Sequence, residues 1–117
     1  MKSFIVALIL FSLFLGGAML NSFYIVHTSN EIISYADGIR ASLYAPSDID
    51  LYWQKHRGFL ALSVSESKIE RMDELIISLF AADAEQNSYE TERICRLIAS
   101  LSKDISANER ISLQGIL

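Results

Sequence analysis

The sequence predicts an all-α protein in which an N-terminal transmembrane helix leads into an antiparallel helical bundle of three to four helices. Three observations predict this fold class. The chain begins with a long uncharged apolar run, its remaining apolar residues recur three and four positions apart, and it has only one proline and five glycines among 117 residues. No stretch alternates apolar and polar residues as a half-buried strand would. A chain of this length has room for one folded domain.

The N-terminal segment is long and apolar enough to cross a bilayer. No charged residue occurs between Ser3 and Asn30. A helix over residues 4–26 would span about 34 Å, against roughly 30 Å of bilayer hydrocarbon. Tyr24 and His27 would then lie at the level of the lipid headgroups. We therefore expect residues 1–27 to be a membrane anchor and residues 28–117 to be an extracytoplasmic helical bundle domain.

The same segment has features of a cleavable secretory signal. Lys2 supplies a minimal basic region, residues 4–15 supply an apolar region, and the Gly-Gly-Ala sequence ending at Ala18 permits a cut after that residue. The apolar run continues beyond Ala18 to Val26, where a signal would have a polar region. We favour the retained anchor. The alternative is a secreted helical protein, cleaved after Ala18, that binds a small ligand or ion.

Charge indicates the topology and excludes one class of partner. Lys2 is the only charged residue before Glu31, so the positive-inside rule places the N-terminus in the cytoplasm and the C-terminal domain outside the cell membrane. The chain has ten basic and fourteen acidic residues, and the part after Lys2 has a net charge of −5. A nucleic-acid partner would require a basic face, so none is expected.

Two helices are expected in the first half of the exported part. Thr28 and Glu31 have the spacing of a capping box, so a helix is expected to begin there and to end at Pro46. Ser47 and Asp50 have the same spacing and predict the start of a helix over roughly residues 47–63. The apolar residues at helical spacing are Ile32, Ala36, Ile39, Leu43, Ile49, Leu51, Tyr52, Trp53, Phe59, Leu60 and Leu62.

Two further helices and a tail are expected in the second half. One helix covers roughly residues 66–85, and Asn87 with Glu90 caps the next. Ser106 and Glu109 predict a turn or a new cap before an apolar tail that packs onto another surface. The apolar positions are Ile69, Met72, Ile76, Leu79, Phe80, Ile94, Leu97, Ile98, Leu101, Ile105, Ile111, Leu113, Ile116 and Leu117. Apolar residues at this spacing are compatible with helix packing within one chain or between copies.

Three features of the chain resemble a bacterial protein family. Trp53, the helix "SKIERMDELIISL" and the ending "ISANERISLQGIL" are similar to the family known as domain of unknown function 4363. Its members are small proteins of Gram-positive, mostly clostridial bacteria, with one N-terminal membrane segment and a helical exterior part. The chain departs from the family in having Gly115 in the tail, where a polar residue is expected, and in lacking an acidic, His-containing start to the third helix. The resemblance implies a single-pass topology and a multi-span membrane protein as partner, but no activity.

The stretch "LYWQKHRGF", residues 51–59, is the candidate interaction or membrane-interface site. Its aromatic residues surround the only concentration of basic residues in an acidic domain. In one interpretation Trp53 and Phe59 fill the bundle core and the basic residues are solvated. In the other, the stretch contacts anionic headgroups or an acidic partner. The candidate residues are Tyr52, Trp53, Lys55, His56, Arg57 and Phe59.

No catalytic, cofactor or metal site is predicted. The chain contains no zinc-protease, nucleophile-elbow or phosphate-loop motif. His27 and Glu31 provide at most half of a metal site, and His56 has no ligand partner at helical spacing. The acidic residues of the third helix alternate with Lys68 and Arg71, as on a solvated face with ion pairs.

Cys95 is the only cysteine, which excludes an intramolecular disulfide and a cysteine-based zinc site. Because its neighbours are apolar, we expect it to behave as a small buried apolar residue; the alternative is a thiol that links two copies. Taken together, the sequence predicts a non-enzymatic, membrane-anchored interaction or accessory module. Its expected partners are the membrane and either a multi-span membrane protein or a second copy.

Overall fold

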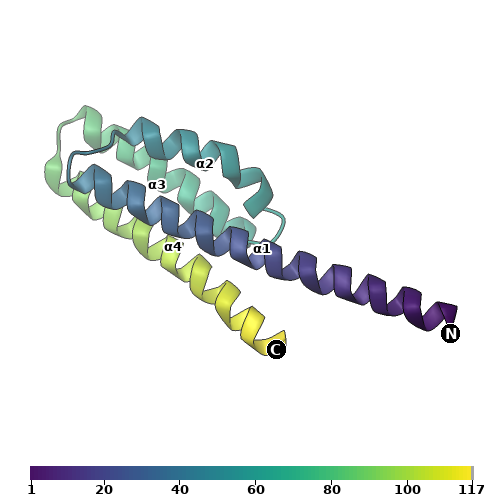
Figure 1. The fold of residues 1–117 in the computed structure, drawn as a ribbon. Coiled ribbons are helices and arrows are strands. Elements are labelled where there is room, and N and C mark those ends of the chain that lie inside the picture. The colour runs from purple at the N-terminus through teal and green to yellow at the C-terminus, as the bar shows by residue number, and fades with distance from the viewer. Residues whose placement is uncertain (117) are drawn as a thin grey trace.

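The computed structural model describes the backbone of residues 1–116 and the side chains of residues 1–107. The described chain forms four helices: α1 (Lys2–Arg40), α2 (Pro46–Leu60), α3 (Glu66–Ala84) and α4 (Ser88–Ile116). Successive helices run in opposite directions and pack side by side, and α4 returns along α1 to close the bundle (Figure 1). The predicted all-α bundle is confirmed.

Helix α1 is continuous through the predicted break at Thr28. It runs for 39 residues, and Thr28 lies buried within it rather than capping a new helix. Nothing between Asn21 and Glu31 interrupts a helix, since this stretch contains neither proline nor glycine. The capping-box prediction at Thr28 is therefore wrong, because this threonine faces the core of the bundle.

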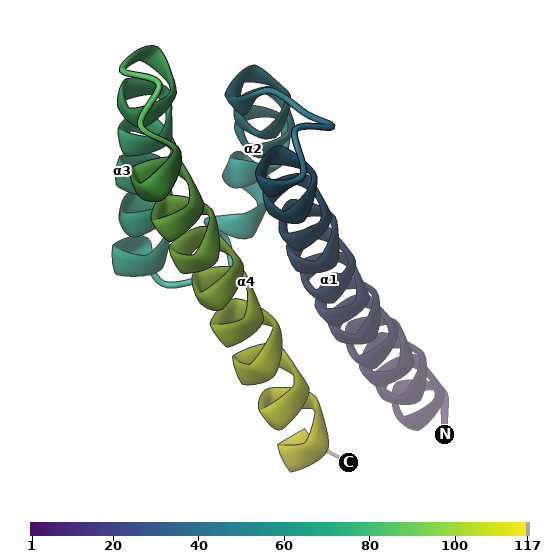
Figure 2. The same ribbon diagram turned by 90° about the vertical axis from the view of Figure 1, so that its left-hand side faces the viewer.

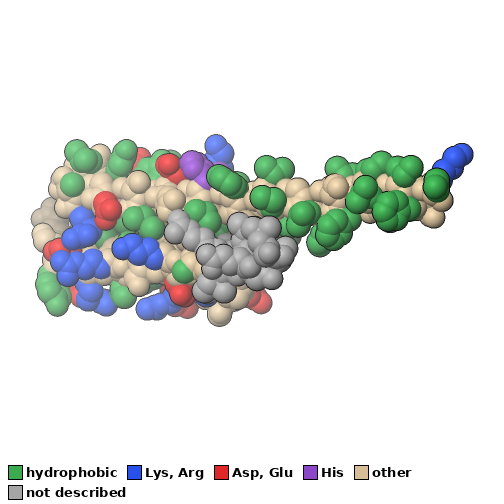
Figure 3. All heavy atoms as spheres, turned by 60° about the horizontal axis from the view of Figure 1, so that its bottom comes forward, with side chains coloured by type: hydrophobic (Ala, Val, Ile, Leu, Met, Phe, Trp, Pro, Cys, Tyr) green, Lys and Arg blue, Asp and Glu red, His purple; other side chains and the backbone are tan. Residues whose placement is uncertain are grey.

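The two halves of α1 have different surroundings. Residues 2–20 extend beyond the bundle with all their large apolar side chains except the half-buried Leu15 exposed, and the first fully buried residue is Ile25 (Figures 1 and 3). This makes the molecule 67 Å long and only 25 by 23 Å across. By length and composition, this apolar part of α1 could cross a membrane or serve as a signal sequence. The apolar segment outside the bundle ends near Leu20 and spans about 28 Å, so the last residues of the predicted 4–26 span lie beside the bundle.

The connection between α1 and α2 differs from the prediction. Helix α1 ends at Arg40, where Ser42 adopts a left-handed conformation (φ 62°). Pro46 is the first residue of α2 rather than the end of the preceding helix, a position where its missing N–H costs nothing. The carboxylate of Asp48, not a Ser47–Asp50 pair, caps α2 by accepting a hydrogen bond from the Ala45 N–H (2.8 Å).

The start of α4 confirms the expected cap, whereas its end does not. The Asn87 side-chain oxygen accepts a hydrogen bond from the Glu90 N–H (3.1 Å). The helix then continues through Ser106, which is buried within it, so the predicted turn there is wrong. The side chains of the apolar tail (Ile111, Leu113, Ile116 and Leu117) lie outside the described residues. The backbone of α4 reaches past the start of α3, as Figure 2 shows.

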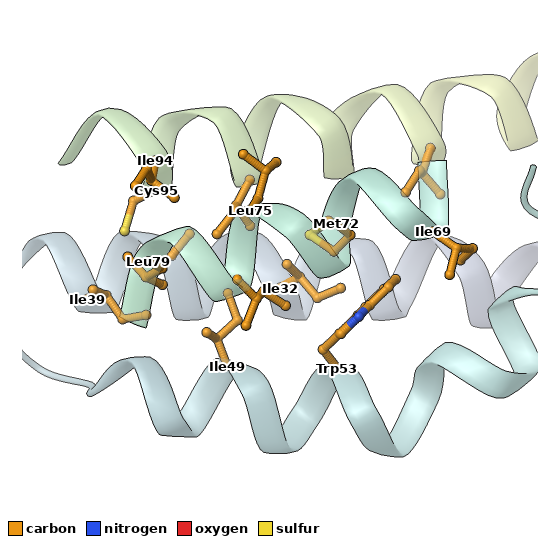
Figure 4. Packing of buried hydrophobic residues seen from close by; sticks show 14 of the residues in the cluster. Ile32, Ile39, Ile49, Trp53, Ile69, Met72, Leu75, Leu79, Ile94 and Cys95 are labelled. Atoms are coloured by element: carbon orange, nitrogen blue, oxygen red, sulfur yellow. The ribbon is translucent and has the colours of Figure 1, made fainter. Parts of the chain in front are cut away.

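The core is built from the apolar stripes of all four helices (Figure 4). Trp53 of α2 is completely buried and is the largest side chain of the core. Four of the apolar residues expected in the first half are exposed instead: Leu43 (77%), Leu51 (70%), Phe59 (69%) and Leu62 (80%). The buried apolar residues are Ile25, Ile32, Ala36, Ile39, Ile49, Trp53, Leu60, Ile69, Met72, Leu75, Ile76, Leu79, Ala82, Ile94, Cys95, Ile98 and Ile105.

Truncating a core residue of α3 tests this packing. We expect Leu79→Ala to lower the free energy of unfolding by about 2–5 kcal/mol, because Leu79 is fully buried and its loss leaves a cavity. Ile77→Ala is the matched control: Ile77 lies on the same helix but is 69% exposed, so its truncation should change stability by only about 0.5 kcal/mol. Urea unfolding followed by circular dichroism measures both. Equal losses would contradict the assigned core face.

Candidate functional site

The six candidate residues of α2 divide between two neighbouring helices. Trp53 and Arg57, four residues apart, reach the same carboxylate on α3. Tyr52, His56 and Phe59 contact aromatic residues of α1. Lys55 is exposed. The stretch therefore joins α2 to both α1 and α3 and does not form one patch.

The contact with α3 centres on Asp73. Trp53 donates its indole N–H to Oδ1 of Asp73 (2.6 Å). Arg57 donates to both carboxylate oxygens, from Nε to Oδ1 at 3.1 Å and from Nη2 to Oδ2 at 2.6 Å. We call these three residues the Asp73 network. The two-pronged contact is the geometry in which a guanidinium binds a carboxylate most strongly.

The Asp73 network holds its carboxylate ionised. Partial burial acts to raise the pKa of Asp73, but the hydrogen bonds from Arg57 and Trp53 and the charge of Arg57 outweigh it, so the pKa is lowered. The pKa of Arg57 is raised by the same contact. The network thus satisfies the one polar atom of the buried Trp53 and leaves no uncompensated charge beside the core.

The contact with α1 is an aromatic cluster. Tyr52 packs between His56 and Tyr35, with ring centroids 4.4 and 5.2 Å away. The ring of Tyr24 lies 5.6 Å from that of His56 and 6.1 Å from that of Phe59. These separations are typical of favourable aromatic pairs. Its members on α1 are Tyr24 and Tyr35, so the cluster holds α2 alongside α1 over this stretch. Tyr24 lies near the point where α1 leaves the bundle.

His56 is the titratable member of this cluster. Its Nδ1 lies 2.5 Å from the hydroxyl of Tyr24, a hydrogen bond that Nδ1 accepts when the proton is on Nε2 and donates when Nδ1 itself is protonated. Burial, together with the nearby Lys55 and His27, lowers the pKa of His56. The cluster therefore favours the neutral form near pH 7 and is weakened when the ring is protonated.

The structure corrects part of the sequence interpretation of this stretch. Trp53 fills the core as one interpretation expected, but Phe59 does not, since it is 69% exposed. Nor are the basic residues uniformly solvated, because Arg57 pairs with Asp73. Sequence reasoning missed Asp73 and Tyr24 as partners. The four-residue spacing of Trp53 and Arg57 indicated a shared face, but nothing in the sequence specified which helix it meets.

Two acidic residues of α3, Asp73 and Glu74, form ion pairs. Arg71 pairs with Glu74 within the helix (3.6 Å), and Lys68 reaches Asp104 of α4 (3.4 Å). Asp73 bonds to α2 as described, while Glu66 and Glu70 are exposed. In the described part of the chain, no three His, Cys, Asp or Glu side chains gather as a metal ion would require.

Cys95 is fully buried on α4, as expected. Burial raises the pKa of its thiol to about 11, so the reactive thiolate is scarce at neutral pH. This residue acts as part of the core, and its burial does not favour a bridge between two copies.

Comparisons with protein-family models, with curated proteins and with solved structures find no match for this chain. The resemblance to domain of unknown function 4363 stays a prediction from the sequence.

Neutralising Asp73 tests the network. We expect Asp73→Asn to lower the free energy of unfolding at pH 7 by about 1–3 kcal/mol, because it removes charge-assisted hydrogen bonds and leaves Arg57 unpaired. The folded-state pKa of Asp73 is lowered, so its contribution is present above the ordinary carboxyl pKa and disappears as the pH falls through the lowered value. The stabilities of the two proteins should therefore begin to converge below about pH 4, and become equal only below the lowered pKa of Asp73.

Urea unfolding at several pH values measures this difference. Glu74→Gln is the matched control on the same helix, and because its ion pair is exposed, we expect a change below about 1 kcal/mol. A stability gap for Asp73→Asn that is as large at pH 2 as at pH 7 would contradict the ionic role.

Titrating His56 tests the aromatic cluster. We expect its pKa, followed by NMR of the ring protons, to lie below the usual value near 6.5. Because the folded-state pKa is lowered, His56 contributes stability above the unfolded value, and this contribution falls as the pH drops below it. Tyr24→Phe removes the hydrogen bond to Nδ1, so it should shift the pKa of His56.

The control is Tyr35→Phe, since Tyr35 contacts Tyr52 rather than the His56 ring. That substitution should leave the pKa of His56 nearly unchanged. A pKa that does not respond to Tyr24→Phe would contradict the hydrogen bond between the Tyr24 hydroxyl and this ring.

Proposed function

We propose that this chain is a single-pass membrane protein whose helical bundle lies outside the cytoplasm and acts as a non-enzymatic interaction or accessory module. One observation carries the proposal. Residues 2–20 of α1 form a helical segment whose large apolar side chains, except the half-buried Leu15, are exposed and which the bundle does not cover. Exposing so much contiguous apolar surface to water is unfavourable, whereas a bilayer would cover it.

The distribution of apolar surface supports a retained anchor over a cleaved signal. A cut after Ala18 would leave the described contacts between α1 and the bundle in place, the first of which is the hydrogen bond from Asn21 to Ser63. The resulting soluble protein would, however, start with an exposed Met19 and Leu20 and keep Phe23, which is 76% exposed. A retained helix places these residues at the edge of the membrane.

The orientation of the chain follows from its charges. Lys2 precedes the apolar segment, and the acidic bundle follows it. The positive-inside rule then supports a cytoplasmic N-terminus with the bundle outside. The candidate partners are a multi-span membrane protein, as the family resemblance implies, or a second copy of this chain.

The bundle has surface suited to such a partner. Ile77 and Phe80 are exposed apolar side chains on α3, which packs against α2. A groove of about 400 Å³ lies between these helices, with Trp53 and Ile76 among the residues that line it. Apolar side chains beside a groove are common where proteins dock.

The state of the N-terminus tests the anchor. We expect intact mass to match residues 1–117, and the chain to stay with membranes after alkaline extraction. Leu10→Lys should reduce membrane retention, because it places a charge within the apolar segment. Leu51→Lys is the matched control, an exposed position on the bundle where the same charge should have no effect. A soluble wild-type species beginning at Met19 would contradict the anchor and support the secreted alternative.

Crosslinking in intact membranes tests the interaction role. Surface lysines such as Lys55 and Lys103 should give crosslinks either to a membrane protein or between copies, identified by mass spectrometry. Recovery of monomer alone with several crosslinkers would contradict the proposed module while leaving the anchor intact.

A further inference from the structure

Three apolar side chains are exposed at the end of the bundle from which α1 emerges. Phe23 of α1 is 76% exposed, Phe59 near the end of α2 is 69% exposed, and Leu62 in the α2–α3 connection is 80% exposed. We call Phe23, Phe59 and Leu62 the collar. They come from three different segments of the chain: α1, α2 and the α2–α3 connection. None of them belongs to the buried core that holds the helices together.

Two contacts place the collar at one level along α1. The ring of Phe59 packs edge-on against that of Tyr24, with centroids 6.1 Å apart. Asn21 donates a hydrogen bond from its side chain to the Ser63 hydroxyl (2.7 Å), which ties the residue after Leu62 to α1. The base of the bundle therefore lies beside residues 21–24, immediately after the apolar segment that lies outside the bundle.

The straight course of α1 gives the collar a fixed position relative to that segment. Residues 2–20 and the stretch that contacts α2 belong to one uninterrupted helix, without proline between them (Figure 1). When residues 2–20 span the hydrocarbon, the collar lies at the boundary between hydrocarbon and headgroups. Phenylalanine and leucine on the apolar side of surface-bound segments are buried at this depth.

We propose that the collar inserts into the lipid headgroup region and holds the base of the bundle in contact with the membrane surface. This inference rests on the proposed anchor. Its occupant is lipid, because the apolar segment continues directly from the collar and brings the bilayer to it. The collar itself carries no charge, so apolar contact suffices and zwitterionic lipid should be bound.

The neighbouring polar groups suit the same position. Asn21 and Ser63 lie beside the collar, and the exposed Lys55 is one helical turn before Phe59 on α2. Amide, hydroxyl and ammonium groups can bond to lipid phosphates while adjacent apolar groups lie deeper. By contrast, the exposed Leu51 lies near the other end of α2, away from the exit of α1.

A fluorophore at Leu62 tests the proposal in the full chain. Leu62→Cys is labelled with an environment-sensitive dye and reconstituted into phosphatidylcholine vesicles. Cys95 reacts little because it is buried with a pKa of about 11, and the labelled parent protein corrects for it. Leu51→Cys is the matched control, since it is 70% exposed and lies on the distal part of α2. Quenching is measured with aqueous iodide and with lipid that carries a nitroxide near its headgroup.

We expect the label at residue 62 to be quenched several-fold more by the nitroxide lipid, and several-fold less by iodide, than the label at residue 51. Equal quenching by iodide at both positions would overturn the proposal, because the collar would then face water. Protection from both quenchers would also overturn it, since protein, either the end of α4 or a second copy, would cover the collar. Lipid quenching that requires anionic phosphatidylglycerol would assign the contact to charge and overturn the apolar role.

Alkaline extraction of the same vesicles separates this inference from the anchor. Labelled protein that stays with the vesicles while residue 62 remains open to iodide refutes the collar and retains the anchor. Protein released by the extraction refutes the anchor itself. A second pair of variants, Phe59→Ser and Leu51→Ser, should both fold, because both residues are exposed, and only Phe59→Ser should increase iodide access to residue 62.

Discussion

The continuity of α1 is the constraint on which the other features of this molecule depend. One helix provides both an apolar segment outside the bundle and one of the four packed helices. Ile25, Ile32, Ala36 and Ile39 bury their side chains against the other helices, so the bundle cannot separate from α1 without losing part of its core. The exposed apolar segment and the domain therefore share one element, and the hydrophobic effect that folds the domain also fixes it to this segment.

The remaining contacts align the other helices with this one. The aromatic cluster sets α2 along α1, and the Asp73 network sets α3 against α2. The hydrogen bonds and ring contacts in these two groups depend on direction, whereas apolar burial does not. They therefore determine which faces of the helices meet. The ion pair between Lys68 and Asp104 adds a link between α3 and α4 at the base of the bundle.

The helical class and most core positions could be predicted from the sequence because both depend on local periodicity. The stripe of α3 is an example: Ile69, Met72, Ile76 and Leu79 recur at helical spacing and are all buried. Caps were less predictable. Thr28 has the spacing of a cap but lies within a helix, because a capping pattern competes with uninterrupted helical sequence on both sides. Partners across helices, such as Asp73 for Trp53, depend on how helices rotate against each other, which the spacing along one chain does not specify.

The lack of a flexible linker between the apolar segment and the bundle limits where the domain can act. The packed part of α1, from Asn21 to Arg40, rises about 30 Å. With the proposed anchor in a bilayer, the bundle occupies a shallow layer of about that height and cannot sample the space beyond it. Confinement to such a layer raises the effective concentration of the bundle for targets within the same membrane, so weak contacts suffice for association. A soluble target would gain no such advantage.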